Sequence, residues 1–274
     1  MSLSRLFVPA FALTVMGVLS SGCVQGGQAP DEGEEAVADN HLSFEEFLDL
    51  TYKEPGGVWI ADGDTPFETM DQLREFYEHL VQQDGALAIY TSGGQDVKWS
   101  DQQKLNLTYC VSTGFGSRYA EVVAAMEAAT GAWEAAANVD FVHLSQYDSN
   151  CTATQNGVLF DVRSTKTQQY LARAFFPNYS RKSRNILIST SAFNYGNSPS
   201  VTGVLRHELG HTLGFRHEHT RPEAGTCFED NNWRALTPYD SDSVMHYPQC
   251  NGTGDWSLVL TNSDKAGAAS VYGN

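Results

Sequence analysis

The stretch HELGHTLGFRH at residues 207–217 decides how the rest of the chain is interpreted. Its first five residues fit H-E-x-x-H, and on a helix the i, i+4 spacing puts both imidazoles on one face, where they can chelate zinc. Glu208 follows the first of them and can serve as general base toward a water molecule. Gly214 accepts the left-handed turn that ends a helix, so the chain can reverse and bring back a third imidazole from His217.

The third histidine makes this pattern specific. A chain of this composition contains H-E-x-x-H by chance about once in 75 sequences, whereas the motif with the added Gly and His is expected in about 3 of 100,000. We therefore predict one catalytic Zn²⁺ ion held by His207, His211 and His217. Glu229 lies 18 residues after His211, a spacing that also fits a carboxylate ligand on a following helix. Residues 226–234 show no helical apolar stripe, however, and His217 fits better.

A second motif, SVMHY at residues 243–247, begins 26 residues after His217. Together with the zinc motif it resembles the Met-turn of the metzincin metallopeptidases. The resemblance implies that Met245 lies beneath the three histidines as an apolar floor. It also implies that Tyr247 matches the tyrosine that, in astacin-like and serralysin-like metzincins, can ligate zinc and swing to stabilise the oxyanion.

The resemblance can be narrowed to two groups. HELGHTLGFRHE at residues 207–218 resembles the astacin pattern, and the H-E-L-G-H core with SVMHY resembles the bacterial dual-action HEIGH metallopeptidases. In astacins the Glu after the third His pairs with the mature N-terminus, which gives Glu218 that role or, alternatively, the role of a carboxylate behind the ligands or at the surface. His219 and His246 are expected behind the ligands or at the surface as well.

The pattern of apolar residues predicts an α+β, metzincin-like fold. We expect a twisted, mainly parallel sheet of about five strands with two long helices, an active-site cleft, and a loop-rich C-terminal subdomain ending in a helix. Helices are predicted at 117–138, 201–213 and 264–272, the last capped by Ser263. Strands are predicted at 105–111, 140–144, 157–163, 171–176 and 185–190.

The first 23 residues have the pattern of an export signal. Arg5 precedes an apolar run, and small residues then precede Cys23. This resembles the lipobox of bacterial lipoproteins, although the usual Leu stands one position early, at Leu19. We expect residues 1–22 to be a signal peptide and the protein to be exported, either as a cell-envelope lipoprotein acylated on Cys23 or as a secreted protein. Membrane contact is expected only through that lipid anchor.

Cysteine content agrees with export. Without Cys23, four cysteines remain, an even number that suggests two disulfides in an oxidising compartment. Three pairings are open, and proximity in the sequence favours Cys110–Cys151 and Cys227–Cys250. A zinc site built from them is disfavoured because the chain has no C-x-x-C pair.

The net charge of −16 is concentrated in the first part of the chain, since residues 1–100 carry 4 basic and 17 acidic residues. Nucleic acid is a poor partner for such a chain. We expect residues 23–98 to be an acidic tether followed by a helical propeptide, and residues 99–274 to be the zinc metallopeptidase domain. Capping boxes at Ser43/Glu46 and Thr65/Glu68 predict two propeptide helices.

The same region suggests an inhibitory switch, because no cysteine lies between Cys23 and Cys110 to form a cysteine switch. Asp62 or Asp64 could supply a carboxylate to the zinc, as an aspartate does in astacin-like zymogens. The alternative is an ordinary Asp-Gly turn before the predicted helix.

These motifs predict a zinc-dependent endopeptidase that acts on proteins or peptides. Glu208 would be the general base, and Tyr247 would help to stabilise the oxyanion. Two alternatives stay open: an inactive zinc-containing binding protein of the envelope, and a zinc amidohydrolase acting on non-peptide substrates.

Overall fold

The computed structural model describes residues 44–61, 63–78, 87–195, 198–227, 229 and 232–274. The chain divides into two compact units, Met1–His41 and Leu42–Asn274, of which the first lies wholly outside the described residues. The predictions that concern the signal peptide, Cys23, Ser43 and Asp62 therefore fall outside them. Among the described residues, no helix is long and apolar enough to cross a membrane.

A five-stranded sheet has the order β7-β6-β8-β10-β9. Its strands are β6 (Leu107–Val111), β7 (Phe141–His143), β8 (Phe160–Thr165), β9 (Ala172–Arg173) and β10 (Asn185–Ser189). All neighbours are parallel except β9, which pairs antiparallel with β10 at the sheet edge. The predicted mainly parallel sheet is confirmed, with β9 shorter than the expected stretch at 171–176.

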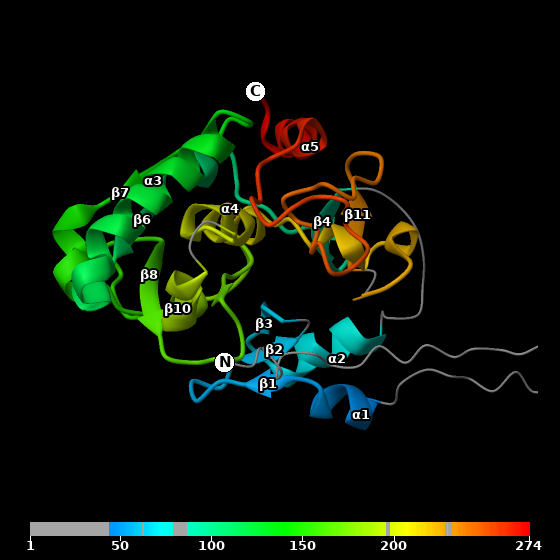
Figure 1. Ribbon diagram of the computed structural model, residues 1–274, viewed down its shortest axis with the longest axis horizontal. Coiled ribbons are helices and arrows are strands. Elements are labelled where there is room, and N and C mark those ends of the chain that lie inside the picture. Colours follow the sequence, from blue (N-terminus) through cyan, green and yellow to red (C-terminus); the bar gives the residue numbers. More distant parts are fainter. Residues whose placement is uncertain (1–43, 62, 79–86, 196–197, 228, 230–231) are drawn as a thin grey trace, which may run out of the picture. The chain divides into compact units, whose positions relative to one another are not determined.

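Two long helices, α3 (Tyr119–Glu134) and α4 (Val201–Thr212), pack on each other and share one apolar core with the sheet (Figure 1). Helix α3 buries Val122, Met126, Ala129 and Trp133, which recur every three or four residues and so form one stripe. The indole Nε1 of Trp133 donates a hydrogen bond of 2.8 Å to the Arg206 carbonyl in α4. Helix α3 thereby fixes the position of the helix that carries the zinc motif.

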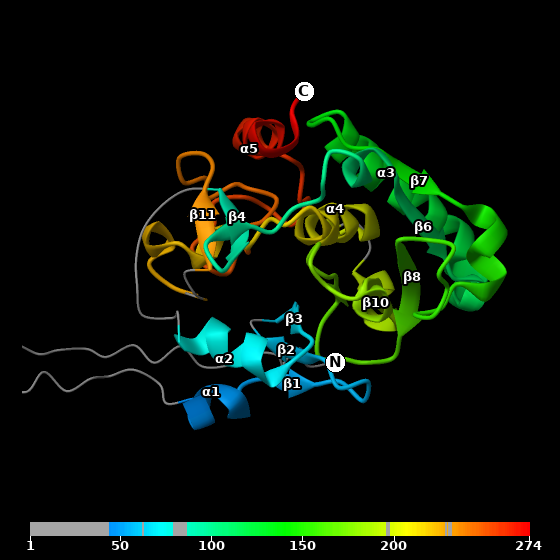
Figure 2. The same cartoon turned by 180° about the vertical axis from the view of Figure 1, so that it is seen from behind.

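Residues 44–78 form a small unit with its own core, drawn in blue and cyan in Figure 2. It contains α1 (Phe44–Asp49), β1 (Tyr52–Lys53), β2 (Trp59–Ala61), β3 (Thr65–Phe67) and α2 (Met70–Glu78). The strands form an antiparallel sheet in the order β1-β2-β3. The core consists of Phe47, Ala61, Phe67, Leu73 and Phe76.

The prediction of a helix that begins at Thr65 is wrong. Residues 65–67 pair with β2 instead, and Pro66 is tolerated there because β3 is an edge strand. The capping box lies four residues later. The Thr69 hydroxyl accepts a hydrogen bond from the Gln72 amide, and the Gln72 side chain accepts one from the Thr69 amide, both at 3.2 Å.

A second small sheet joins distant parts of the sequence in the order β11-β4-β5. Its strands are β4 (Ala88–Ser92), β5 (Gln95–Asp96) and β11 (Trp233–Ala235). The β4 backbone also binds the loop after α4, since the Tyr90 amide donates to the Gly214 carbonyl and the Arg216 amide to the Ala88 carbonyl. The core that contains α4 therefore begins before the expected domain boundary at residue 99.

The C-terminal part is rich in loops and ends in α5 (Asn262–Tyr272), as predicted. The helix is capped by Thr261 rather than by Ser263, and Asp264 completes the capping box. Disulfides join Cys110 to Cys151 and Cys227 to Cys250, the pairing that sequence proximity favours. Short 3₁₀ turns occupy Gln103–Leu105, Thr113–Arg118, Ser145–Asn150, Arg181–Ser183, Thr190–Asn194, Glu218–Thr220 and Pro222–Ala224.

Candidate metal centre and active site

Helix α4 presents the zinc motif, and the turn after it completes the motif. Ser200 caps the helix by accepting a hydrogen bond from the Gly203 amide. The turn depends on Gly214, whose φ is +96° and whose place for a Cβ lies 2.2 Å from the Val97 carbonyl oxygen. Any other residue would be strained and would clash there. The chain reverses at this glycine and returns His217 to the helix face.

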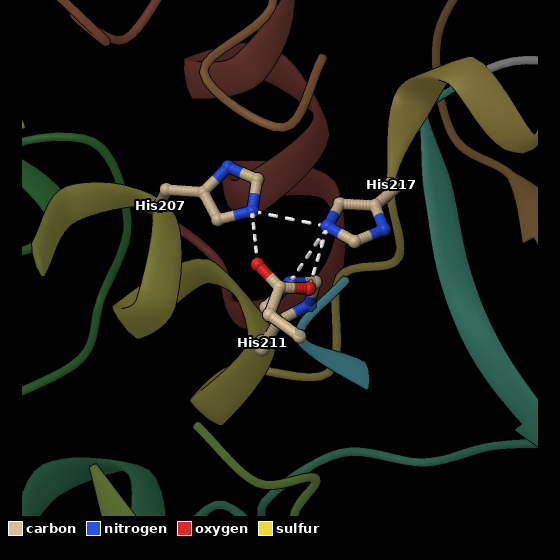
Figure 3. A group of neighbouring side chains, drawn as sticks. His207, His211 and His217 are labelled. Carbon is tan, nitrogen blue, oxygen red and sulfur yellow. Dashed lines mark hydrogen bonds and ion pairs between the residues drawn. The ribbon is translucent and has the colours of Figure 1, made fainter. Parts of the chain in front are cut away.

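The side chains of His207, His211 and His217 point toward one another (Figure 3). The Nε2 atom of His217 lies 3.1 Å from that of His207 and 3.2 Å from that of His211. A tetrahedral zinc ion with Zn–N bonds of about 2.05 Å separates its ligating nitrogens by about 3.3 Å. Both distances are close to this value, and the three nitrogens lie within 4.8 Å of one another, so they can hold one zinc ion.

The opposite nitrogen of each ring is held by an acceptor. Nδ1 of His207 lies 2.8 Å from the Val244 carbonyl, and Nδ1 of His211 lies 2.8 Å from the Phe215 carbonyl. A ring that donates from Nδ1 keeps its proton there and leaves the Nε2 lone pair free for a metal. Burial, assisted by His217, lowers the pKa of His211 well below its ordinary value, which favours the neutral ligand form.

His217 is oriented by Glu229, whose Oε1 contacts the His217 Nδ1 atom. The other Glu229 oxygen accepts a hydrogen bond of 2.5 Å from Arg216. This geometry does not match the alternative in which Glu229 is the third ligand. The Glu229 carboxylate contacts Nδ1 of His217, whereas the three Nε2 atoms converge on the opposite side of that ring. A carboxylate in this place fixes the ring and makes it a stronger ligand. Sequence reasoning considered Glu229 only as a ligand and missed this role.

Glu208 is buried beside the three rings, and its Oε2 atom has no hydrogen-bond partner. Burial, together with the charge of Asp64, raises its pKa well above the ordinary value, against the opposing charges of His217 and Arg173. The side chain lines a pocket of about 210 Å³ with Tyr247 and His207. A buried carboxyl oxygen without a hydrogen-bond partner is expected of a group that binds a water molecule or a substrate.

Met245 packs directly beneath α4. A Cβ on Gly210 would lie 2.3 Å from the Met245 sulfur, so the glycine of the motif makes room for it. The turn is held from below by Asp264 of α5, which accepts hydrogen bonds from the Ser243 hydroxyl at 2.5 Å and the Val244 amide at 2.9 Å. The C-terminal helix therefore holds the methionine turn, and the Val244 carbonyl of that turn orients His207. Sequence reasoning missed this link.

The ring of Tyr247 packs against those of His207 and His217. Its ring centroid lies 4.6 Å from that of His217, and its amide donates to the Nδ1 atom of His219 at 3.1 Å. His219 and His246 are both buried, and the His219 ring lies 4.6 Å from that of His217, so of the two expected places the structure agrees with the one behind the ligands and not with the surface. Burial lowers the pKa of His246 to about 4, and its Nε2 atom lies 2.7 Å from the Tyr239 hydroxyl.

Asp64 reaches the same centre from the loop between β2 and β3. Its Oδ1 atom lies 3.2 Å from Nε2 of His217, and its Oδ2 atom lies 3.6 Å from Nε2 of His207. Oδ2 also accepts a hydrogen bond of 2.5 Å from the Tyr247 hydroxyl. Burial opposes ionisation of Asp64, yet the neighbouring imidazoles hold its pKa well below the ordinary value. Three imidazoles and one carboxylate thus form a four-ligand set for one metal ion.

Glu218 follows the third histidine and is fully buried. Burial raises its pKa to about 8, and its Oε1 atom accepts hydrogen bonds from Arg221 at 2.5 Å and from the Asp240 amide at 3.0 Å. In this structure the cation that faces Glu218 is therefore a guanidinium three residues along the chain.

These features are those of a metal-dependent hydrolase. One metal site lies on a helix, the chain turns back after that helix to supply the third histidine, and a methionine turn lies beneath the helix. Comparisons with known proteins agree. The family model of the matrixins matches residues 98–224. A zinc metalloproteinase of Caenorhabditis elegans, nas-30, is 37% identical over 76 residues, which cover 21% of this chain and 10% of that protein.

One further relative supports the same class, and one solved structure supports the fold. The astacin-like metalloprotease toxin 2 of Loxosceles intermedia is 34% identical over 85 residues, which cover 24% of this chain and 33% of the toxin. The solved structure of myroilysin superposes with a TM-score of 0.50 at 17% identity, covering 68% of this chain and 98% of that one. Together these findings support a metzincin zinc metallopeptidase, although the family model matches less than half of the chain and the matched segments span a third or less of the two curated relatives.

Proposed function

We propose that this chain is a zinc-dependent endopeptidase that is produced in a latent form. The observation that carries the proposal is the convergence of three imidazole Nε2 atoms and the Asp64 carboxylate beside the unpartnered Glu208. His207, His211 and His217 would hold the ion. When bound, zinc supplies Lewis-acid chemistry, since it lowers the pKa of a water ligand toward about 7 and polarises a carbonyl.

The protein residues divide the remaining work. Glu208 is placed to take a proton from the attacking water and to return it to the leaving amine. Its burial supports both halves of that role, because a raised pKa makes a carboxylate a better base and its conjugate acid a usable donor. The hydroxyl of Tyr247 is placed to donate a hydrogen bond to the oxyanion once Asp64 no longer accepts it.

Asp64 is the group that keeps the chain latent in this proposal. Its two oxygens face the three ligand nitrogens and also engage Tyr247, so the carboxylate occupies the position that water and substrate need. The other half of the predicted switch, Asp62, lies outside the described residues. Release of residues 44–78 would remove the carboxylate and free Tyr247 together.

The packing supports a point of separation before β4. Helix α2 ends at Glu78 within the small core of residues 44–78, whereas β4 begins at Ala88 and is bound to the loop of His217. We therefore place maturation between Glu78 and Leu87 rather than at residue 98. Export, with or without acylation of Cys23, stays part of the proposal and is tested by mass spectrometry of the N-terminus.

The direct test is proteolysis of casein and of a peptide library by the full chain and by chain cut between Glu78 and Leu87. Cut protein should cleave both substrates and lose activity to a chelator. Zinc-loaded, cut protein that cleaves neither would favour the binding-protein alternative, and cleavage of small amides alone would favour the amidohydrolase alternative.

A further inference from the structure

A second carboxylate of residues 44–78, that of Glu54, contacts residues next to the active site. Glu54 lies in the turn that joins β1 to β2, where its amide donates to the Val58 carbonyl. Its side chain is largely buried against Arg173 and Tyr170, which belong to the larger region, residues 87–274. Arg173 donates from Nη2 to Oε2 at 2.7 Å and from Nε to Oε1 at 3.0 Å, and the Tyr170 hydroxyl donates to Oε1 at 2.5 Å.

These two residues belong to the edge of the cleft. Arg173 is the last residue of β9, the edge strand of the five-stranded sheet. Tyr170, Leu171 and Ala172 line the same pocket as Glu208 and His207. A group bound by both Arg173 and Tyr170 therefore contacts a residue that lines this pocket, and it lies at the end of the strand that borders it.

Arg173 is built to hold a carboxylate. Only 3% of its side chain is exposed, so its charge has little water to solvate it. Its other hydrogen bonds go to the Ala174 and Asn185 carbonyls, from the remaining nitrogen Nη1. Nε and Nη2, both of which donate to Glu54, thus form a fork that matches the two oxygens of one carboxylate, and the Tyr170 hydroxyl adds a third donor.

We propose that Arg173 and Tyr170 form a substrate subsite for an acidic side chain, which Glu54 fills in the full chain. This inference rests on the proposed peptidase function. Once residues 44–78 have left, the fork faces the cleft without its carboxylate, and a buried guanidinium without a counter-ion is costly. A glutamate or aspartate side chain of the substrate restores the pair, so peptides that carry one at the matching position are cleaved faster.

The small unit thus imitates a substrate at two points. Asp64 occupies the centre of the reaction, and Glu54, ten residues earlier, occupies the selectivity site.

The test uses chain that folds at full length and is then cut at a protease site introduced between Glu78 and Leu87. Peptide pairs that differ only in Glu or Gln at one position are compared by kcat/KM, position by position. We expect one position at which Glu is preferred at least tenfold. Arg173→Gln should reduce this ratio to about twofold or less and Tyr170→Phe should reduce it partly, while the control Arg234→Gln, in an exposed pair with Asp96, should leave it unchanged. An equal preference in the Arg173→Gln variant would overturn the proposal.

A binding measurement separates this inference from the peptidase proposal. The synthetic fragment 44–78 is titrated into cut chain, with and without Glu54→Gln. We expect at least tenfold weaker binding for Glu54→Gln to unaltered chain and no difference when the chain carries Arg173→Gln. Loss of this difference in unaltered chain would refute the subsite whether or not the protein cleaves peptides. Tenfold weaker binding in a chain without peptidase activity would keep the carboxylate site and refute only the proposed reaction.

Discussion

Residues 44–78 and residues 87–274 are built on different principles. The larger region has one continuous core from the sheet through α3 and α4 to α5, and two disulfides cross-link it. The smaller region has a separate core of five buried side chains, led by Leu73 and Phe76. The two cores are distinct clusters within one compact unit, and Arg216 of the larger region lies 5.2 Å from the ring centroid of Phe76 in the smaller core.

The contacts between the two regions include many polar ones. Asp64 engages the histidines and Tyr247, Glu54 engages Arg173, and Glu68 accepts hydrogen bonds from Ser180. When the two regions separate, polar groups regain hydrogen bonds to water. An apolar core shared between the regions would instead be exposed to water, which would oppose separation. We infer that the smaller region can leave as a folded fragment without unfolding the larger one.

The largest expected effect belongs to the larger region alone. Glu208→Gln should lower kcat of cut protein by about 10²–10⁴, the usual contribution of a general base. Zinc content should stay at one ion per chain, because the three imidazoles are untouched. Assay of metal content beside peptide cleavage checks this, and unchanged proteolysis would exclude Glu208 as the base.

Leu73→Ala tests whether the smaller core is independent. The buried leucine should cost about 2–5 kcal/mol of stability in residues 44–78, as other buried Leu→Ala changes do. We expect full chain to show higher peptidase activity with little change in the main thermal transition. A matched loss of stability in both regions, seen by hydrogen exchange, would mean that the two cores form one cooperative unit.

Asp64→Ala removes the carboxylate but leaves the smaller region folded. Loss of a charge-assisted contact worth about 1.5–3 kcal/mol should raise the activity of full chain about ten- to a hundredfold. Asp71→Ala, on the exposed side of α2, is the matched control and should change nothing. Equal activity of unaltered and Asp64→Ala chain would show that latency comes from some other contact.

The smallest effect is expected for Glu68→Ala. Its partner Ser180 is exposed, and surface contacts of this kind contribute about 1 kcal/mol or less. Activity of full chain should rise less than fivefold. A rise as large as that of Asp64→Ala would place the main attachment of the smaller region at its rim instead of at the metal centre.

The centre was predictable because its ligands lie close together in the sequence. A helix fixes the spacing of His207 and His211, and Gly214 dictates where the chain must turn. Met245 was found by its resemblance to a known turn. The supports of the centre were not predictable, since Glu229 and Asp264 act through contacts that no local spacing encodes.

Local signals failed where tertiary pairing outweighed them. Thr65-Pro66 has the composition of a helix start, yet these residues pair with β2 in a hairpin. Strand β4 was assigned to the acidic front part because its partner β11 lies more than 140 residues later. Glu54 gave no signal, because a single glutamate in an acidic segment cannot be distinguished from its neighbours until Arg173 is placed beside it.

We propose that residues 44–78 block a complete zinc site. The peptidase activity of zinc-loaded full chain is therefore measured before and after one cut between Glu78 and Leu87, with zinc content recorded at both points. We predict one zinc ion throughout, and activity that is low before the cut and at least tenfold higher after it. Equal activity before and after release of the fragment, at the same zinc content, would contradict the account.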